Sequence, residues 1–331
     1  MKAVVIRSHK PPVLEWGDAP GPVAGNGEVL VRIHASALNR ADLLQARGLY
    51  PPPAGESEVP GLECAGEIET VGAGVEGWQP GDRVMALLAG GGQAERVAIP
   101  TGQLMPIPDG LDYEQAAALP EVALTSWTNL VHEGGLEPGA EGQTVLITAA
   151  ASGVGTFAVQ LARELDARVL VAGRSLERLE RLRELGADAC VELGAGLPAA
   201  VRDLTDGEGV GLVIDLAGGE GVAHALTALR RQGRLVLVGV LAGGRAEIDL
   251  ADVLRRRLQL VGSVLRARSR EEKKSLVEAF SQFANERLND GRLKPIVDRV
   301  IPAPEVAEAY AQMAAGGVWG KIVLRMNEFV R

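Results

Sequence analysis

From residue 144 onward, short β-branched runs alternate with runs of helical period. Thr144 to Ala149 has the pattern of a buried strand, and a helix is expected from residue 153 to Leu165 because apolar residues recur there at spacings of four, three and four. Ser175 is expected to cap a second helix that ends before Gly186. Further strands are predicted at residues 168–172, 189–193, 210–216, 234–240 and 258–264. Six strands linked by helices are typical of an α/β doubly wound parallel sheet, the Rossmann fold.

The first 120 residues show a different pattern. From Glu28 to His34, Val29, Val31 and Ile33 share one face, while His34 falls on the other, as in a half-exposed antiparallel strand. Dense turn signals follow, including three consecutive prolines at 51–53 and three glycines at 90–92. We expect a small β-barrel with loops, and a surface position for His34.

The last part of the chain has no place in a six-strand sheet. Residues 293–301 and 321–325 are strand-like, and residues 303–315 have a helical pattern. We expect this part to return to the first domain. The expected domains are a catalytic domain at 1–121, a dinucleotide-binding domain at 122–267, and a return to the catalytic domain at 268–331.

Composition and charge narrow the class of protein. The chain has 331 residues, 47% hydrophobic and 23% charged, which suits a globular protein of about two domains. A net charge of −9 disfavours nucleic acid as a partner, and the run Arg255 to Arg257 is expected to be a solvated helix end. Residues 142–162 lack charge, but the small residues at their centre indicate a turn rather than a membrane span. Two cysteines and the absence of a secretory pattern indicate a reducing, cytoplasmic setting.

A glycine-rich turn between the first strand and the first helix of the Rossmann pattern is the candidate cofactor site. Such a turn points backbone N–H groups and the positive end of a helix at one place, which suits a pyrophosphate. The turn contains Ser152, Gly153, Val154 and Gly155. A turn that only packs a helix against a sheet would look similar, but the surrounding strand–helix pattern favours a nucleotide.

The end of the second strand bears on which nucleotide binds. An NAD site would place an acidic residue there to bind the ribose 2′-OH. This chain instead has Gly173, Arg174 and Ser175, followed one turn later by Arg178. Arginines suit a 2′-phosphate, so the sequence predicts NADPH. The alternative is that both arginines are solvated surface residues.

No metal site is expected. The histidines are His9, His34, His132 and His224, and none has the spacing of a ligand pair. Cys64 and Cys190 fall in different predicted domains and are expected to be packed thiols.

Several motifs together resemble a known family. They are Asn39-Arg40-Ala41-Asp42, Gly48-Leu49-Tyr50-Pro51, Pro60-Gly61-Leu62-Glu63, Gly81-Asp82-Arg83-Val84, residues 149–155, and Gly320-Lys321-Ile322-Val323-Leu324. The chain resembles the zinc-free quinone oxidoreductase (zeta-crystallin-like) branch of the medium-chain dehydrogenase/reductase superfamily, and most closely its p53-inducible quinone oxidoreductase-type members. The resemblance implies a GroES-like catalytic domain, a Rossmann domain, NADPH bound between them, and a homodimer.

The resemblance also assigns residues. Leu62 stands where zinc-containing relatives have a histidine ligand, and Asn39 stands in the region of their cysteine ligand. Asn39 and Tyr50 match substrate-pocket positions, and Thr125 matches a position near the nicotinamide. Positions lining the nicotinamide correspond to Val240, Leu241, Val264 and Leu265.

These assignments lead to a mechanistic hypothesis. NADPH would pass a hydride to a quinone, which spreads the incoming charge through its own conjugation, while the Tyr50 hydroxyl and the Asn39 amide donate hydrogen bonds. Alternatively, Tyr50 anchors a rigid loop and Asn39 caps a helix. Asp42 and Glu63 are expected to form structural ion pairs with neighbours such as Arg40 or Arg47. The competing functions are reduction of an alkenal or enoyl C=C bond, and NADPH binding without catalysis.

Overall fold

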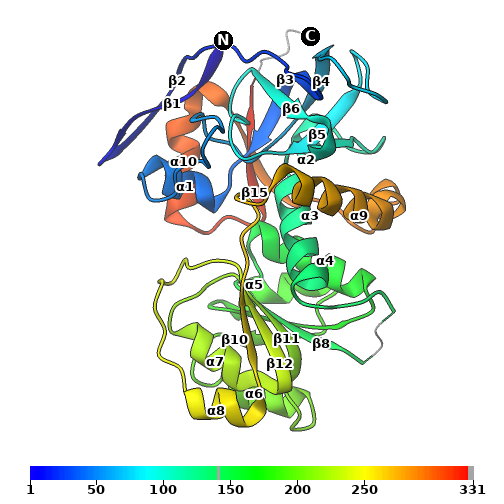
Figure 1. Ribbon diagram of the computed structural model, residues 1–331. Coiled ribbons are helices and arrows are strands. Elements are labelled where there is room, and N and C mark those ends of the chain that lie inside the picture. Colours follow the sequence, from blue (N-terminus) through cyan, green and yellow to red (C-terminus); the bar gives the residue numbers. More distant parts are fainter. Residues whose placement is uncertain (140–141, 327–331) are drawn as a thin grey trace. The chain divides into compact units, whose positions relative to one another are not determined.

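The computed structural model describes residues 1–139 and 142–326 (Figure 1). The chain divides into two compact units. The first comprises Met1–Leu124 together with Leu265–Arg331, and the second comprises Thr125–Val264. The chain therefore leaves the first unit once and returns to it once.

The second unit is built on a six-stranded parallel sheet. Its strands are β8 (Thr144–Thr148), β9 (Arg168–Gly173), β10 (Ala189–Glu192), β11 (Val210–Asp215), β12 (Leu229–Leu237) and β13 (Gln259–Gly262). They lie in the order β10-β9-β8-β11-β12-β13, with every neighbouring pair parallel. This order places the change of winding direction between β8 and β11, as in a doubly wound fold. The predicted α/β fold class is confirmed.

Helices connect these strands. They are α4 (Gly153–Glu164), α5 (Leu176–Glu180), α6 (Leu197–Leu204), α7 (Gly221–Ala228) and α8 (Leu250–Arg256). The helix predicted after Ser175 begins as expected, since the Ser175 hydroxyl accepts a hydrogen bond from the Arg178 N–H. Its second half is a 3-10 helix, Arg181–Leu185, which ends at Gly186 in the left-handed conformation. The arginine run 255–257 closes α8, as predicted.

The first unit contains a seven-stranded sheet and a separate hairpin. The sheet has β3 (Glu28–Ala37), β4 (Glu63–Val71), β5 (Arg83–Leu87), β6 (Arg96–Pro100), β7 (Leu104–Pro106), β14 (Val297–Pro302) and β15 (Lys321–Arg325), and the hairpin has β1 (Lys2–His9) and β2 (Pro12–Asp18). Strand β15 pairs antiparallel with β3, so the last described strand joins the sheet that contains β3. The helices are α1 (Arg40–Ala46), α2 (Tyr113–Ala117), α9 (Arg270–Asn289) and α10 (Val306–Ala315), while α3 (Pro120–Trp127) begins in this unit and ends in the other.

The predicted surface position of His34 is wrong. Strand β3 does bury Val29, Val31 and Ile33, but His34 is only 4% exposed. The ring of Tyr113 from α2 stacks on it, with 4.1 Å between the ring centroids. A helix remote in sequence therefore covers this face of β3 at His34, and burial lowers the pKa of the His34 imidazole.

The uncharged stretch 142–162 is split between β8, a turn and α4. Within the described part of the chain, no helix is both long enough and apolar enough to span a bilayer.

Candidate active site

A buried ion pair lies where three elements of the first unit meet. Lys321 is the first residue of β15, Glu63 is the first residue of β4, and Asn39 precedes α1. The Lys321 ammonium donates to Glu63 Oε1 and to Asn39 Oδ1, both at 2.6 Å. The side chains of Lys321 and Glu63 are 5% and 0% exposed. We call these three residues the Lys321 centre.

The hydrogen bonds of Asn39 are all made inside the protein. Its amide nitrogen donates to Glu63 Oε1 at 2.9 Å and to the Ala37 carbonyl at 3.3 Å, and its amide oxygen accepts from Lys321. This arrangement leaves no amide hydrogen of Asn39 for an acceptor. The alternative position for Asn39, at the start of a helix, is the one observed.

A second set of polar groups surrounds Asp42 on α1. The Asp42 carboxylate accepts from the backbone N–H groups of Asn39 at 2.7 Å and Gly61 at 3.2 Å, and from the Gln93 amide at 3.3 Å. Gln93 in turn accepts from the Tyr310 hydroxyl at 2.7 Å. Burial raises the pKa of the Asp42 carboxyl to about 6, against the lowering effect of these hydrogen bonds.

The expected ion-pair partners of Asp42 and Glu63 were wrong. Neither of the proposed neighbours, Arg40 and Arg47, holds these carboxylates. Glu63 pairs instead with Lys321, 258 residues away, and Asp42 binds backbone N–H groups. Arg40 reaches the carbonyl of Met313 at the end of α10.

Tyr50 lies in the loop after α1 and is held by Arg266. The Arg266 guanidinium lies over the Tyr50 ring, 5.1 Å from its centroid, and donates to the Tyr50 carbonyl at 3.1 Å. It also donates to the Ala89 carbonyl and to Gln45 Oε1, both at 2.7 Å. Burial raises the pKa of the Tyr50 phenol, so it stays protonated at neutral pH. Arg266 is 4% exposed and was missed by sequence reasoning, because nothing local relates residues 50 and 266.

Glu121 at the start of α3 is a further group that the sequence did not single out. Its backbone N–H donates to Glu63 Oε2 at 2.8 Å, which ties α3 to the Lys321 centre. Burial, followed by the Glu63 charge, raises the pKa of the Glu121 carboxyl to about 8. Thr125 lies one turn further along the same helix, is 6% exposed, and accepts at its carbonyl from the Asn129 amide at 2.7 Å.

In the second unit, the glycine turn lies at the carboxyl end of β8. Ser152 caps α4, and its hydroxyl accepts from the Gly155 N–H at 3.2 Å. A Cβ on Gly155 would lie 2.4 Å from the Ala150 carbonyl oxygen, so only glycine lets the helix begin this close to the strand. With Gly153 and Val154 opening a twelve-residue helix, the turn offers backbone donors and a helix N-terminus that fit a pyrophosphate.

Two arginines, Arg174 and Arg178, follow the carboxyl end of β9. Gly173 ends the strand and Ser175 caps α5. Arg174 between them is exposed, and its guanidinium has no hydrogen bond or ion pair with the residues that the structure describes. Arg178 follows in the first turn of the helix. No carboxylate is present at residues 173–175.

Four apolar residues were expected to line the nicotinamide. Val240, Leu241 and Val264 are 51%, 54% and 53% exposed on the second unit, whereas Leu265 is 7% exposed and belongs to the first unit. Exposed aliphatic side chains near the carboxyl ends of β12 and β13 are compatible with contact to a flat ring.

Asp215 at the carboxyl end of β11 organises the neighbouring loop. Its Oδ1 accepts from the Thr148 hydroxyl at 3.1 Å and from the N–H groups of Ala217 and Gly218 at 2.8 Å. Asp215 thereby fixes the chain at the switch point between β8 and β11. Sequence reasoning missed it, although an acidic residue that ends an apolar strand is a signal that could have found it.

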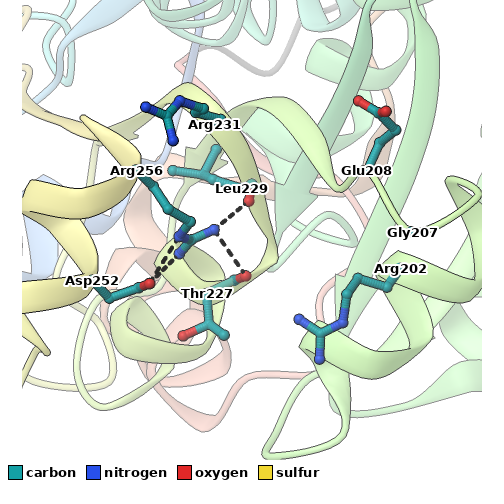
Figure 2. Close-up of a pocket in the computed structure, with 8 residues that line it drawn as sticks. All are labelled: Arg202, Gly207, Glu208, Thr227, Leu229, Arg231, Asp252 and Arg256. Carbon is teal, nitrogen blue, oxygen red and sulfur yellow. Dashed lines mark hydrogen bonds and ion pairs between the residues drawn. The ribbon is translucent and has the colours of Figure 1, made fainter.

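A pocket of about 300 Å³ in the second unit lies elsewhere (Figure 2). Its walls come from the last turns of α6 and α7, the loop before β11, the start of β12, and α8. Arg256 on α8 bonds Asp252 and the Leu229 carbonyl. This is the amino end of the parallel strands, opposite to the glycine turn. The pocket is therefore not the cofactor site.

Within residues 1–139 and 142–326, no group of three or more His, Cys, Asp or Glu side chains is arranged to hold a metal ion. At the two positions that the resemblance compares with zinc ligands, Leu62 is a core residue, 2% exposed, and Asn39 is bonded to an ammonium. Both cysteines are free thiols, Cys64 buried and Cys190 partly buried.

Comparisons with known proteins agree with these features. An alcohol dehydrogenase GroES-like domain matches residues 25–109, and a zinc-binding dehydrogenase domain matches residues 153–282. A quinone oxidoreductase-like protein 2 homolog of Nematostella vectensis is 31% identical over 307 residues, which is 92% of this chain and 83% of that protein. A quinone oxidoreductase of Thermus thermophilus, solved also with NADPH, is 36% identical with a TM-score of 0.81, covering 98% of this chain and 100% of that one. An NAD-dependent alcohol dehydrogenase is 31% identical with a TM-score of 0.84, covering 99% and 100%.

Proposed function

Because the chain belongs to the medium-chain dehydrogenase/reductase superfamily, among its quinone oxidoreductase-like members, we propose that it is an NADPH-dependent quinone oxidoreductase that works without zinc. The observation that carries this proposal is the Lys321 centre. A divalent cation bound by Asn39 Oδ1 would have to displace the ammonium that Glu63 and Asn39 hold at 2.6 Å. A site already neutralised by lysine favours an acceptor that needs no Lewis acid, such as a quinone.

The cofactor proposal rests on the second unit. The turn at Ser152, Gly153, Val154 and Gly155 would hold the pyrophosphate, and Gly173, Arg174, Ser175 and Arg178 would hold the 2′-phosphate. The aliphatic side chains of Val240, Leu241, Val264 and Leu265 would contact the nicotinamide, with Thr125 near it. Bound NADPH supplies a hydride, which this chain has no side chain to provide.

The chain's own contribution to the reaction is proposed to centre on Tyr50. A quinone becomes a hydroquinone by gaining one hydride and one proton. The Tyr50 phenol, kept protonated by burial, would donate a hydrogen bond to the acceptor oxygen as negative charge develops there. The proton would come from Tyr50, which water then reprotonates, or from water itself. Arg266 fixes the Tyr50 loop through the backbone carbonyl. Asn39 is proposed to act on the loop and helix geometry through Lys321 and Glu63 rather than as a donor to the acceptor.

A panel of acceptors tests this function. Purified protein is mixed with NADPH and, in turn, a benzoquinone, a naphthoquinone, an alkenal and an enoyl thioester, and kcat/KM is compared. We expect the quinones to be preferred. Faster turnover of the alkenal or the thioester would make the protein a C=C reductase, and tight NADPH binding without oxidation by any acceptor would make it a non-catalytic binding protein.

Two substitutions assign the roles within that assay. Tyr50→Phe is expected to lower kcat/KM for a quinone about 100-fold, as loss of one oxyanion donor does elsewhere, with the Kd for NADPH unchanged. Full activity of this variant would remove Tyr50 from the mechanism. Arg174→Ala is expected to weaken NADPH binding about tenfold and leave NADH binding unchanged, since one charge-assisted contact to the 2′-phosphate is lost.

We further propose that the protein is a homodimer. We also propose that its partner is a small molecule, not a nucleic acid or a membrane, and that it works in the cytoplasm. Strand β13 is the last strand of its sheet, and Leu260 on it is 50% exposed. An edge strand with an exposed aliphatic side chain is suited to pairing with a second copy. Light scattering should give twice the chain mass, and Leu260→Lys should shift it to the monomer.

A further inference from the structure

Asp215 is a buried carboxylate to which the proposed mechanism gives no part. It ends β11 and is 1% exposed. Its Oδ1 accepts three hydrogen bonds, from the Thr148 hydroxyl at 3.1 Å and from the Ala217 and Gly218 N–H groups, both at 2.8 Å. Thr148 is the last residue of the neighbouring strand β8, so the carboxylate joins two strand ends to the chain that leaves β11. We call residues 215–219 the Asp215 loop.

The Asp215 loop is bonded to the loop that follows β12. The Ala217 carbonyl accepts from the Ala242 N–H at 2.8 Å. The Gly219 N–H donates to the Gly243 carbonyl at 2.9 Å. Both hydrogen bonds join backbone atoms, so they form only while the two loops keep their relative position. A displacement of the Asp215 loop would therefore break these bonds or move the second loop with it.

The second loop turns at Val240 and Leu241. The Gly243 N–H donates to the Val240 carbonyl at 3.0 Å, which closes a four-residue turn over residues 240–243, here called the β12 turn. This turn packs on Gly218, where an added Cβ would lie 2.7 Å from the Val240 Cα. The side chains of Val240 and Leu241 are nevertheless 51% and 54% exposed. The β12 turn thus presents two aliphatic side chains on a backbone that the Asp215 loop holds in place.

We propose that Asp215 is a positioning residue for hydride transfer, which fixes the β12 turn through the Asp215 loop and thereby fixes the nicotinamide ring. This inference rests on the proposed function, because contact between the nicotinamide and the side chains of Val240 and Leu241 is part of it. A displacement of about 1 Å between the reacting groups can cost about 100-fold in rate. The phosphates of the cofactor are proposed to bind elsewhere, at the glycine turn and after β9. Loss of Asp215 should therefore lower kcat and leave the binding of the adenosine half unchanged.

Two substitutions of Asp215 test the proposal. Asp215→Ala removes the acceptor atom, whereas Asp215→Asn keeps an Oδ1 that can accept the same three hydrogen bonds. With NADPH and a naphthoquinone, we expect Asp215→Ala to lower kcat about 100-fold and Asp215→Asn to retain most of it. A kcat equally low in both variants would contradict the proposal, because asparagine keeps the acceptor.

Asp249→Ala is the matched control. Asp249 lies in the same unit, at the start of α8, and its Oδ1 also accepts from two backbone N–H groups, those of Ala251 at 2.9 Å and Asp252 at 3.1 Å. Its loss removes the same kind of bond from a different loop, so kcat should stay close to that of the wild type. If Asp215→Ala lowers kcat no more than Asp249→Ala does, the proposal is overturned.

Two binding measurements separate positioning from a merely structural role and need no turnover. The first is calorimetric titration with 2′,5′-ADP, which carries the 2′-phosphate and lacks the nicotinamide. We expect the same Kd for Asp215→Ala as for the wild type, and a Kd weakened as much as kcat would contradict the proposal by showing a general loss of structure.

The second measurement is the emission of the dihydronicotinamide in bound NADPH. In Asp215→Ala it should move toward that of free NADPH, while Asp215→Asn and Asp249→Ala should match the wild type. Wild-type emission in Asp215→Ala contradicts the proposal even if no quinone is reduced. Failure of the proposed function would differ, since the wild type would then bind NADPH without passing its hydride to a quinone.

Discussion

Replacing Lys321 by methionine perturbs the Lys321 centre most directly. The substitution keeps most of the side-chain volume and removes the ammonium, so the Glu63 carboxylate, 0% exposed, loses its counter-ion. Glu63 keeps two donors, the Asn39 amide at 2.9 Å and the Glu121 N–H at 2.8 Å. The charge therefore stays buried with only neutral partners.

The size of the effect follows from these contacts. Two hydrogen bonds of 2.6 Å from a charged donor are lost, each worth about 1.5–3 kcal/mol. Breaking a buried pair by removing one partner costs about 3–5 kcal/mol in other proteins. We expect the free energy of unfolding to fall by about 3–5 kcal/mol in Lys321→Met. Adding Glu63→Gln should recover part of this loss, because a neutral amide replaces the isolated carboxylate.

Urea unfolding followed by tryptophan fluorescence measures both variants, since Trp16 and Trp78 pack against the core of the first unit. Lys274→Met serves as the exposed lysine control and should change stability by less than about 0.5 kcal/mol. A loss in Lys321→Met no larger than that of the control would refute the reasoning. So would a double variant less stable than Lys321→Met alone.

Other predictions concern pH, the glycine turn and the Tyr50 loop. Burial raises the pKa of Glu121 from 4.5 to about 8, so between these pH values the folded chain holds a proton that the unfolded chain has lost. The free energy of unfolding should therefore fall as the pH rises from about 4.5 to 8. The raised pKa of Asp42 has the same effect between pH 3.8 and about 6. In urea titrations across this window, the fall should be smaller in Glu121→Gln, and an unchanged slope would argue against the raised pKa. Gly155→Ala should weaken NADPH binding at least about tenfold in a fluorescence titration, because the added Cβ would lie 2.4 Å from the Ala150 carbonyl oxygen. Wild-type affinity in this variant would show that the glycine turn does not bind the cofactor. Arg266→Lys should reduce kcat/KM for quinones and leave the affinity for NADPH unchanged. The reason is that one ammonium cannot reach the carbonyls of Ala89 and Tyr50 and also Gln45. An equal loss of kcat/KM and of NADPH affinity would mean general unfolding.

The periodic elements of the fold could be predicted from the sequence because each has a local signal. The cap at Ser175, the stop at Gly186 and the end strand at residues 321–325 appear where apolar spacing and turn residues place them. So do the strands of the parallel sheet, except that β12 spans Leu229–Leu237 instead of residues 234–240. The details that depend on packing could not be predicted from the sequence. His34 alternates outward on its strand, and only the position of Tyr113 shows that it is buried.

The residues of the candidate site also fall into two groups, those with a local signal in the sequence and those that only the fold brings together. The glycine turn and the arginines after β9 lie within short segments, so spacing was enough to propose them as cofactor-binding candidates. Lys321 and Glu63 are separated by 258 residues, and Arg266 reaches Tyr50 across 216, so no pattern along the chain could pair them. Asn39 was a candidate from the sequence, but its amide hydrogens could be assigned to Glu63 and Ala37 only from three-dimensional contacts.

The most direct measurement is a stopped-flow experiment on protein treated with EDTA and shown by elemental analysis to be free of zinc. NADPH or NADH is mixed with enzyme and a naphthoquinone, and the loss of reduced nucleotide is followed together with the hydroquinone formed. We predict one hydroquinone per NADPH, full activity after chelation, and a higher kcat/KM with NADPH than with NADH. Activity that disappears with EDTA and returns when zinc is added would contradict this mechanism.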